Sequence, residues 1–263
     1  MKARRGARIG AWVLVSLIFL FLFAPVSLVV LFSFNGGTAT GPPFEGFSLR
    51  WYDKLLSDQE FLDALYNSVI VAGVTVAFVV VVGTTAAFGL AHRPSRLTAA
   101  LSALVVTPLI VPGLFLGVAL LSFVTRLGFE PSIATVFVGH ALVTLPIVFL
   151  VLSARLARLD LAMVEAARDL GASATQAFVK VILPALAPAL VGAALLVLAW
   201  SFDEFIITLF TNGGDTTVPV LIFSRLRQGL DPSINAIASI VVATTIIAAA
   251  IAGRLISGKG IVR

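Results

Sequence analysis

Six long stretches of this 263-residue chain contain no aspartate, glutamate, lysine or arginine. Each can supply the roughly 20 apolar residues that a helix needs to cross about 30 Å of hydrocarbon. They run from Ile9 to Phe44, Ala64 to His92, Leu97 to Thr125, Pro131 to Ala154, Val181 to Phe202 and Pro232 to Gly253. The pattern predicts an all-α membrane protein with six transmembrane helices, near residues 10–33, 65–91, 99–125, 132–153, 183–210 and 233–256.

The composition excludes several other classes of protein. The chain is 59% hydrophobic and 12% charged, whereas an average soluble domain is about 25% charged, so a soluble enzyme and a disordered linker are excluded. It contains no cysteine and two histidines, His92 and His140, so we expect no disulfides, no metal centre and no cofactor. The net charge is +5, but the basic residues do not form one face, and we expect no nucleic-acid partner.

The lysines and arginines are distributed unequally between the two sides of the predicted helices. Thirteen lie on one side: Lys2, Arg4, Arg5, Arg8, Arg93, Arg96, Arg155, Arg158, Arg168, Lys180, Arg254, Lys259 and Arg263. Five lie on the other: Arg50, Lys54, Arg126, Arg225 and Arg227. Because cytoplasmic loops are enriched in basic residues, we expect both the N and C termini to be cytoplasmic. A signal peptide is the alternative for the first stretch, but its length favours a retained helix.

Two external loops carry signals for helix starts. Ser57 and Glu60 have the spacing of a capping box, which predicts the start of the helix that leads into the second span. Asp231 followed by Pro232 predicts the start of the sixth span, since aspartate is a preferred N-cap and proline suits the first helical position.

The cytoplasmic loop between the fourth and fifth spans predicts a short helix of its own. Asp160 is a suitable N-cap, residues Leu161 to Leu170 are good helix formers, and Gly171 suits the left-handed position after a helix. Ser173 and Gln176 then form a second capping box. So short a helix is marginal in water, so we expect it to dock onto a partner. An elbow lying on the bilayer surface is the alternative.

This loop carries a spaced motif: Glu165-Ala166-Ala167, three residues, Gly171, nine residues, Val181, one residue and Leu183-Pro184. The motif resembles the EAA loop of ABC importer permeases, which usually has isoleucine where Val181 stands. The resemblance implies a type I ABC importer permease fold with a single transmembrane permease domain over residues 1–263. It also implies that residues 160–172 form the cytoplasmic coupling helix, which inserts in a groove of an ATPase subunit. The ATPase-coupling residues would be Glu165, Ala166, Ala167, Gly171, Leu183 and Pro184.

Further motifs extend the resemblance over nearly the whole chain. They are Phe32-Ser-Phe-Asn35, Phe47-Ser-Leu-Arg-Trp51-Tyr52, Asn67-Ser68, Ser201-Phe-Asp-Glu204 and Asn235-Ala236. These motifs look like those of the PotC-type permeases of spermidine/putrescine importers, and imply polyamine import across the bacterial cytoplasmic (inner) membrane. Because they recur in relatives with other substrates, import of another amine, an opine or an aminophosphonate is the alternative.

The resemblance implies several partners besides the lipid bilayer. They are a second, PotB-like permease, two PotA-like ATP-binding subunits and an extracytoplasmic substrate-binding protein. The chain has no phosphate-binding G-x-x-x-x-G-K-[ST] motif, so we expect ATP hydrolysis in the separate subunits and no enzymatic activity here. An ion-coupled secondary transporter is a remote alternative, which leaves the short cytoplasmic helix unexplained.

Asp203 and Glu204 are the only acidic pair within a predicted span. Carboxylates in a bilayer are costly and usually mark a pathway, so we predict that one of the two, Asp203 or Glu204, helps to attract or pass a cationic substrate. A wet position at the outer interface is the alternative, and adjacent helical residues point about 100° apart, so at most one faces a central pathway.

Other residues inside the predicted spans have two interpretations each. Pro108, Pro112 and Gly113 interrupt the third span and Pro146 interrupts the fourth; such breaks either line a cavity or are packed kinks. We expect His140 to be a packing residue rather than a proton relay. Small residues in the second span, Gly73, Gly83, Ala87 and Gly89, fit close helix packing. Near the outer surface, Trp51, Tyr52, Arg225 and Arg227 suit interfacial anchoring or contact with an external binding protein.

Overall fold

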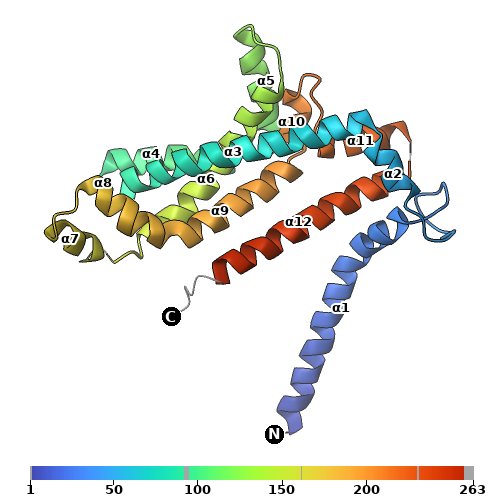
Figure 1. Cartoon of the computed structure of the whole chain (residues 1–263), viewed down its shortest axis with the longest axis horizontal. Coiled ribbons are helices and arrows are strands. Elements are labelled where there is room, and N and C mark those ends of the chain that lie inside the picture. Colours follow the sequence, from blue (N-terminus) through green and yellow to red (C-terminus); the bar gives the residue numbers. More distant parts are fainter. Residues whose placement is uncertain (1, 92–94, 161, 230, 258–263) are drawn as a thin grey trace. The chain divides into compact units, whose positions relative to one another are not determined.

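The computed structural model describes the whole chain except residues 1, 92–94, 161, 230 and 258–263. Over these described residues the regular structure is helical, with no strand beyond an isolated bridge between Asn35 and Phe47. The elements in Figure 1 are α1 (Lys2–Ser33), α2 (Arg50–Leu56), α3 (Gln59–Ala91), α4 (Arg96–Val106), η1 (Thr107–Leu109), α5 (Gly113–Arg126), α6 (Ile133–Leu156), α7 (Ala162–Asp169), α8 (Ala174–Ala177), η2 (Phe178–Ile182), α9 (Leu183–Asp203), α10 (Ile206–Thr211), α11 (Val218–Gln228) and α12 (Ser233–Ser257).

Several helices have the length and composition of membrane spans. Among the described residues four qualify, Gly10–Ser33, Gln59–Leu90, Ile133–Leu156 and Ala174–Asp203. The chain is therefore a multi-pass membrane protein, and its predicted helical class is confirmed. A fifth span results if α4 to α5 count as one broken helix, and the predicted sixth coincides with α12, whose apolar part, Ser233–Ile247, is shorter. His92, Arg93, Lys259 and Arg263, which the sequence analysis used, lie outside the described residues.

The predicted interruption of the third span is confirmed. The segments Arg96–Leu109 and Gly113–Arg126 are bent by 101° relative to each other. Pro112 directly precedes α5 and has an extended ψ of 137°. Because a proline disfavours helical backbone in the residue before it, the helix is interrupted at Val111. The fourth span differs, because α6 continues as a helix through the buried Pro146.

The fifth span ends earlier than the prediction of 183–210. Helix α9 ends at Asp203, and α10 begins only at Ile206. Glu204 leaves the helical conformation with a ψ of 116°. At the other end, α8 and η2 run directly into α9, so residues Ala174–Asp203 form a 30-residue helical segment.

One predicted helix start is wrong by one residue. Ser57 is the C-cap of α2, and its hydroxyl donates to the carbonyls of Asp53 and Lys54. The residue that caps α3 is Asp58, whose Oδ1 accepts the N–H of Phe61 at 3.2 Å. The Ser57 hydroxyl is already bonded to carbonyls of the preceding helix, α2. The carboxylate of the next residue, Asp58, therefore caps α3 instead. The predicted cap of the sixth span is confirmed: Asp231 Oδ1 accepts the N–H of Ser233 at 2.8 Å.

The chain forms two compact units, residues 1–62 with 222–244 and residues 63–221 with 245–263. In the second unit α6 packs against α9, and the side chains of Val148, Leu152 and Leu186 are fully buried between the helices. A Cβ on Gly83 would lie 2.8 Å from Val148 Cγ1. This close approach confirms the packing predicted for Gly83, whereas a Cβ on Gly73 or Gly89 would meet nothing within 4 Å.

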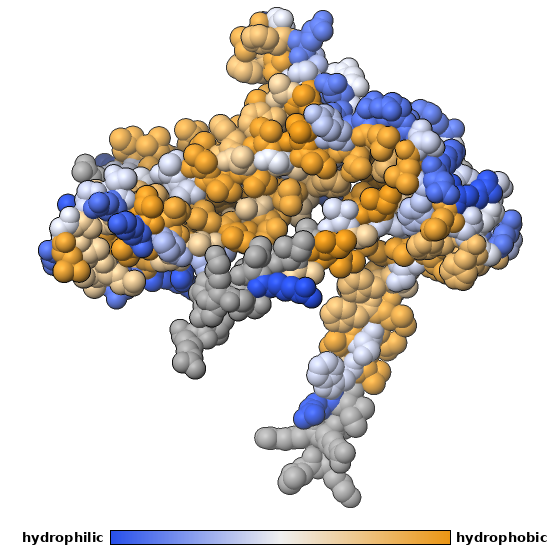
Figure 2. All heavy atoms as spheres, in the orientation of Figure 1, coloured by the Kyte–Doolittle hydropathy of each residue, from blue (hydrophilic) through white to orange (hydrophobic). Residues whose placement is uncertain are grey.

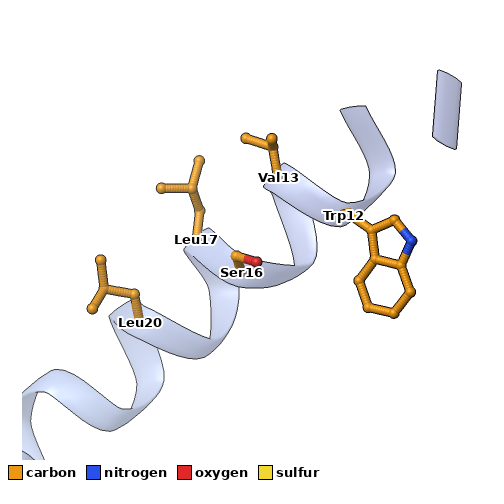
Figure 3. Close-up of a pocket in the computed structure, with 5 residues that line it drawn as sticks. All are labelled: Trp12, Val13, Ser16, Leu17 and Leu20. Atoms are coloured by element: carbon orange, nitrogen blue, oxygen red, sulfur yellow. The ribbon is translucent and has the colours of Figure 1, made fainter. Parts of the chain in front are cut away.

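Helix α1, in the first unit, exposes apolar side chains along its length (Figure 2). A shallow apolar depression on α1 is lined by Trp12, Val13, Ser16, Leu17 and Leu20. Figure 3 shows that these residues come from successive turns of this one helix. The apolar surface of α1 therefore faces outward from its own chain.

Candidate functional site

The first candidate site is the loop around α7, between α6 and α9. Asp160 Oδ1 accepts the N–H of Ala162 at 3.0 Å and starts the helix. At the other end the N–H of Ala172 bonds the carbonyl of Ala167 at 3.0 Å, and Gly171 has a φ of +87°, which favours glycine. The predicted start and stop signals are confirmed, and the helix contacts α8 and η2 beside it (Figure 1).

The loop is attached to its neighbours at both ends. The Ser173–Gln176 capping box is present, with the two reciprocal bonds at 3.2 and 3.0 Å. In η2 the Phe178 ring packs edge-on against Phe88 of α3, with ring centroids 4.9 Å apart. The guanidinium of Arg155, at the end of α6, lies 3.3 Å from the carbonyl oxygen of Ala185 at the start of α9. These contacts attach the two ends of the loop to α3 and to the neighbouring ends of α6 and α9.

Helix α7 itself is a surface feature. None of its described residues is buried. Glu165 and Ala166 are exposed and Ala167 is half-buried, while Leu170, just after the helix, is 90% exposed. A depression beside it is lined by Ala167, Leu170, Gly171, Ala172, Gln176, Ala177, Lys180 and Val181. A helix of eight residues is marginal by itself in water, and the exposed leucine follows its C-terminal end.

The second candidate site is the break between α9 and α10, where the two predicted acidic residues lie. Asp203 is exposed, whereas Glu204 is half-buried. The carboxylate of Glu204 accepts the N–H of Ile207 at 2.9 Å and so caps the start of α10. The two carboxylates therefore differ in availability: that of Glu204 is engaged with backbone, and that of Asp203 faces outward.

Two glycines make room for α10. A Cβ on Gly139 would lie 2.5 Å from Ile207 Cγ2, and one on Gly117 would lie 3.1 Å from Phe210 Cδ2. Helix α10 thus packs closely against α5 and α6 (Figure 1). Sequence reasoning missed α10 because it continued the apolar fifth span through residue 210. The available signal was the acidic pair itself, since a carboxylate can end one helix and cap the next.

His140 of α6 lies beside this break and is buried. Its Nδ1 is 2.8 Å from Ser201 Oγ, and its Nε2 is 2.8 Å from Thr208 Oγ1. Both ring nitrogens have partners, as expected for a packing residue. Among the described residues, no group of three histidine, aspartate or glutamate side chains could hold a metal ion.

The motif residues after α1 form hydrogen bonds within the first unit. Asn35 is buried; its Oδ1 accepts the N–H of Glu45 at 2.7 Å, and its carbonyl accepts Trp51 Nε1–H at 2.9 Å. The hydroxyls of Ser33 and Tyr52 lie 2.7 Å apart. These bonds hold the shape of the segment between α1 and α2.

The motif residues Asn67, Ser68 and Asn235 also form hydrogen bonds to backbone groups. In the second unit, Asn67 donates to the carbonyl of Thr216 at 3.0 Å, and Ser68 Oγ accepts the first N–H of α11 at 2.9 Å. In the first unit, Asn235 donates to the carbonyl of Thr40 at 3.0 Å. These motif residues thus form hydrogen bonds to backbone groups that are distant in the sequence.

Of the four outer residues considered for contact with an external protein, two are already engaged. Trp51 is buried, and Arg225 Nη2 lies 2.6 Å from Asp58 Oδ2 and 3.0 Å from Glu60 Oε2. Burial opposes the charge of Arg225, but its bonds to these two carboxylates outweigh that effect and raise its pKa. Arg227 is exposed.

Over its described residues the chain has the helical structure of a multi-pass membrane protein, with an exposed short helix, α7, between two of its spans. Residues 79–258 match the family described as "Binding-protein-dependent transport system inner membrane component". The chain belongs to this family, and the matched region contains both the α7 loop and the α9–α10 break.

Relatives share most of the chain's length. It is 32% identical to the putrescine transport system permease protein PotI of Escherichia coli (strain K12), over 85% of this chain and 82% of that protein. It is 30% identical to the spermidine/putrescine transport system permease protein PotC of Haemophilus influenzae, over 92% and 94%.

The fold matches solved transporters of other substrates. A chain of a bacterial ABC transporter involved in import of the acidic polysaccharide alginate superposes with a TM-score of 0.73 at 15% identity, covering 98% of both chains. A chain of the MetNI methionine ABC transporter gives a TM-score of 0.65 at 19% identity, covering 75% of this chain and 94% of that one.

Proposed function

We propose that this chain is the permease subunit of an ATP-driven ABC importer and forms half of the translocation pathway for a polyamine, spermidine or putrescine. The observation that carries the proposal is the similarity to PotC and PotI, which extends over most of the chain. A multiply charged cation of this kind suits a pathway that offers the exposed carboxylate of Asp203.

The proposed topology has six spans, with both termini in the cytoplasm of a bacterial cell and the chain in its inner membrane. The broken α4–α5 pair is the third span and α12 is the sixth. The excess of lysine and arginine on one side supports this orientation. We treat residues 1–263 as one permease domain, because the relatives match across both compact units.

The proposed partners follow from the family and from the exposed loop. A second, PotB-like permease would complete the pathway, two PotA-like subunits would hydrolyse ATP, and an external binding protein would deliver the substrate. The family description supports a binding protein, and one structural neighbour was solved with a substrate-bound periplasmic protein. ATP hydrolysis takes place in the separate subunits.

The coupling step would begin at α7. Glu165, Ala166 and Ala167 would contact the ATPase, where small side chains allow close approach, and Gly171 would permit the turn. Leu183 and Pro184 lie within the helical segment Ala174–Asp203. At about 1.5 Å per residue this segment is roughly 45 Å long. It therefore connects the coupling loop at one end to Asp203 and Glu204 at the other, and re-orientation of α9 would open or close the pathway.

Uptake by the reconstituted complex tests the proposal. The whole complex and its binding protein would be placed in proteoliposomes, and entry of radiolabelled putrescine and spermidine measured with and without internal ATP. We expect ATP-dependent accumulation. Hydrolysis of ATP without polyamine entry would show that the proposed substrate is wrong. It would favour another amine, an opine or an aminophosphonate as the substrate. Entry without ATP would favour the ion-coupled carrier.

Two variants separate the proposed roles. Glu165→Ala should leave ATP hydrolysis and assembly in place but lower uptake, whereas Asp203→Asn should lower uptake of the polyamine with coupled hydrolysis retained. Unchanged uptake in Asp203→Asn and in Glu204→Gln would contradict a substrate pathway at this break.

A further inference from the structure

The break between α9 and α10 is organised around one buried imidazole. We propose that His140 is a positioning residue that fixes the geometry of this break, and with it the carboxylates of Asp203 and Glu204, through a directed chain of hydrogen bonds. The consequence for transport rests on the proposed function, but the effect on the break does not.

The direction of each bond follows from counting protons. The hydroxyl of Thr208 has a single proton, which it donates to the carbonyl of Glu204 at 3.1 Å. Thr208 Oγ1 must therefore accept from His140 Nε2–H, at 2.8 Å. In a neutral imidazole the other nitrogen is an acceptor, so Nδ1 accepts the hydroxyl proton of Ser201 at 2.8 Å. The assigned chain runs from Ser201 to His140, then to Thr208 and the Glu204 carbonyl.

This chain connects three helices across the break. Ser201 lies in the last turn of α9, His140 in α6 and Thr208 in α10. Glu204, between α9 and α10, is bound to α10 twice, through its carbonyl and through the carboxylate that accepts the N–H of Ile207. Within these hydrogen bonds, His140 is the residue that bonds to both α9, through Ser201, and α10, through Thr208. It therefore sets the direction in which α10 leaves α9.

The surroundings of these side chains favour a single arrangement of the hydrogen bonds. His140, Ser201 and Thr208 are all buried, so water cannot readily replace a lost partner. Gly139, the residue before His140, and Gly117 let α10 pack directly on the α6 and α5 backbones. A buried donor or acceptor left without its partner is unfavourable, and a shift of α10 relieves it only by moving Glu204 as well.

A spin-label distance measurement tests the structural part. The chain contains no cysteine, so Leu196→Cys on α9 and Leu209→Cys on α10, both exposed in the structure, can carry nitroxides in the full complex with cysteine-free partners. We expect one narrow distance distribution in the parent and a shifted or broadened one in His140→Leu. His140→Gln keeps one donor and one acceptor and should restore the parent distribution in part.

Thr144→Val is the matched control. Thr144 is buried on α6 one turn from His140, but its hydroxyl donates to the carbonyl of His140 within the same helix, at 2.6 Å. This variant also loses a buried hydroxyl, and it should leave the distance distribution unchanged. If His140→Leu does not assemble, two other variants interrupt the same hydrogen bonds and should each broaden the distribution: Ser201→Ala removes the bond to His140, and Thr208→Val removes both the bond to His140 and the bond to the Glu204 carbonyl. An unchanged distribution in His140→Leu, or in both of these variants, would overturn the proposal.

Uptake measured on the same samples keeps the two proposals distinguishable. We expect polyamine uptake to fall roughly tenfold in His140→Leu, the size of effect that loss of a buried hydrogen-bond partner produces, with partial rescue in His140→Gln. Should the parent complex fail to import polyamines, the proposed substrate is wrong, and the distance measurement still decides the role of His140.

Discussion

Helices α1 and α6 are both apolar enough to cross a membrane, yet their surroundings in the chain are opposite. In the most apolar 18-residue stretch of α1, among the described residues, nothing is buried, whereas 61% of the corresponding stretch of α6 is buried. The helix with more protein around it carries His140, Thr144 and Gly139, each with a specific neighbour. Apolar composition thus determines that a helix enters the bilayer, while small and polar residues indicate which helix packs inside the protein.

The largest difference should appear when a leucine is truncated in each helix. Leu152 of α6 is fully buried, and Leu17 of α1 is 57% exposed. We expect Leu152→Ala to lower the free energy of unfolding by about 2–5 kcal/mol, because a cavity remains, and Leu17→Ala to change it by less than about 0.5 kcal/mol. Thermal unfolding of the purified complex checks both. Equal losses would break the comparison and show that α1 is buried against another subunit.

Adding a methyl group should have a smaller effect of the same kind. In Gly139→Ala the new Cβ would meet Ile207 Cγ2 at 2.5 Å, a stiff β-branched side chain, whereas a Cβ on Gly10 of α1 meets nothing within 4 Å. We expect about 1–3 kcal/mol of destabilisation for Gly139→Ala. Gly10→Ala should stabilise by up to about 1 kcal/mol, since alanine is the better helix former. A destabilised Gly10→Ala complex would place a neighbour against α1.

The C-terminal end of α1 is an exception to this comparison and helps to sharpen it. Phe32 and Ser33 are buried, and Ser33 Oγ donates to the carbonyl of Val30 at 2.6 Å, so the hydroxyl of Tyr52 donates to Ser33. Tyr52→Phe removes that one donor and should cost about 1 kcal/mol. Its effect on thermal unfolding should vanish in a Ser33→Ala background. If the double variant loses as much stability as the two single variants together, the Tyr52 hydroxyl stabilises the fold through a contact other than Ser33.

The smallest expected effect is a dependence on pH in the unit that contains α1. Burial tends to raise the pKa of Asp231, but bonds from the Ser233 N–H and from Lys54 Nζ, 2.9 Å away, outweigh it and lower the pKa. A lowered carboxyl pKa stabilises the fold above the ordinary pKa, and this contribution is lost as pH falls through the folded-state value, below about pH 4. Asp231→Asn should remove this part of the acid sensitivity of thermal unfolding. Because the pair is exposed, the change should be slight.

Much of the site was predictable because its signals are local. The ends of α7 follow from Asp160 and Gly171, the second capping box from Ser173 and Gln176, and the bend near Pro112 from proline chemistry. Each of these features depends on residues within a few positions of one another.

The errors arose where a neighbouring element decided between local options. Ser57 was available as an N-cap, but α2 ends there and uses its hydroxyl, so Asp58 caps α3. Apolar residues continue beyond Glu204, yet its carboxylate starts a new helix because Gly117 and Gly139 provide space for α10.

The sequence by itself determined the helical membrane class, the α7 loop and the family resemblance, because hydropathy, caps and motifs act over short distances along the chain. The tertiary structure decided which apolar helix is buried and which carboxylate is engaged. It also decided what His140 does, since its partners lie 61 and 68 residues away. Those contacts depend on how the helices pack, and packing brings together residues that no local pattern relates.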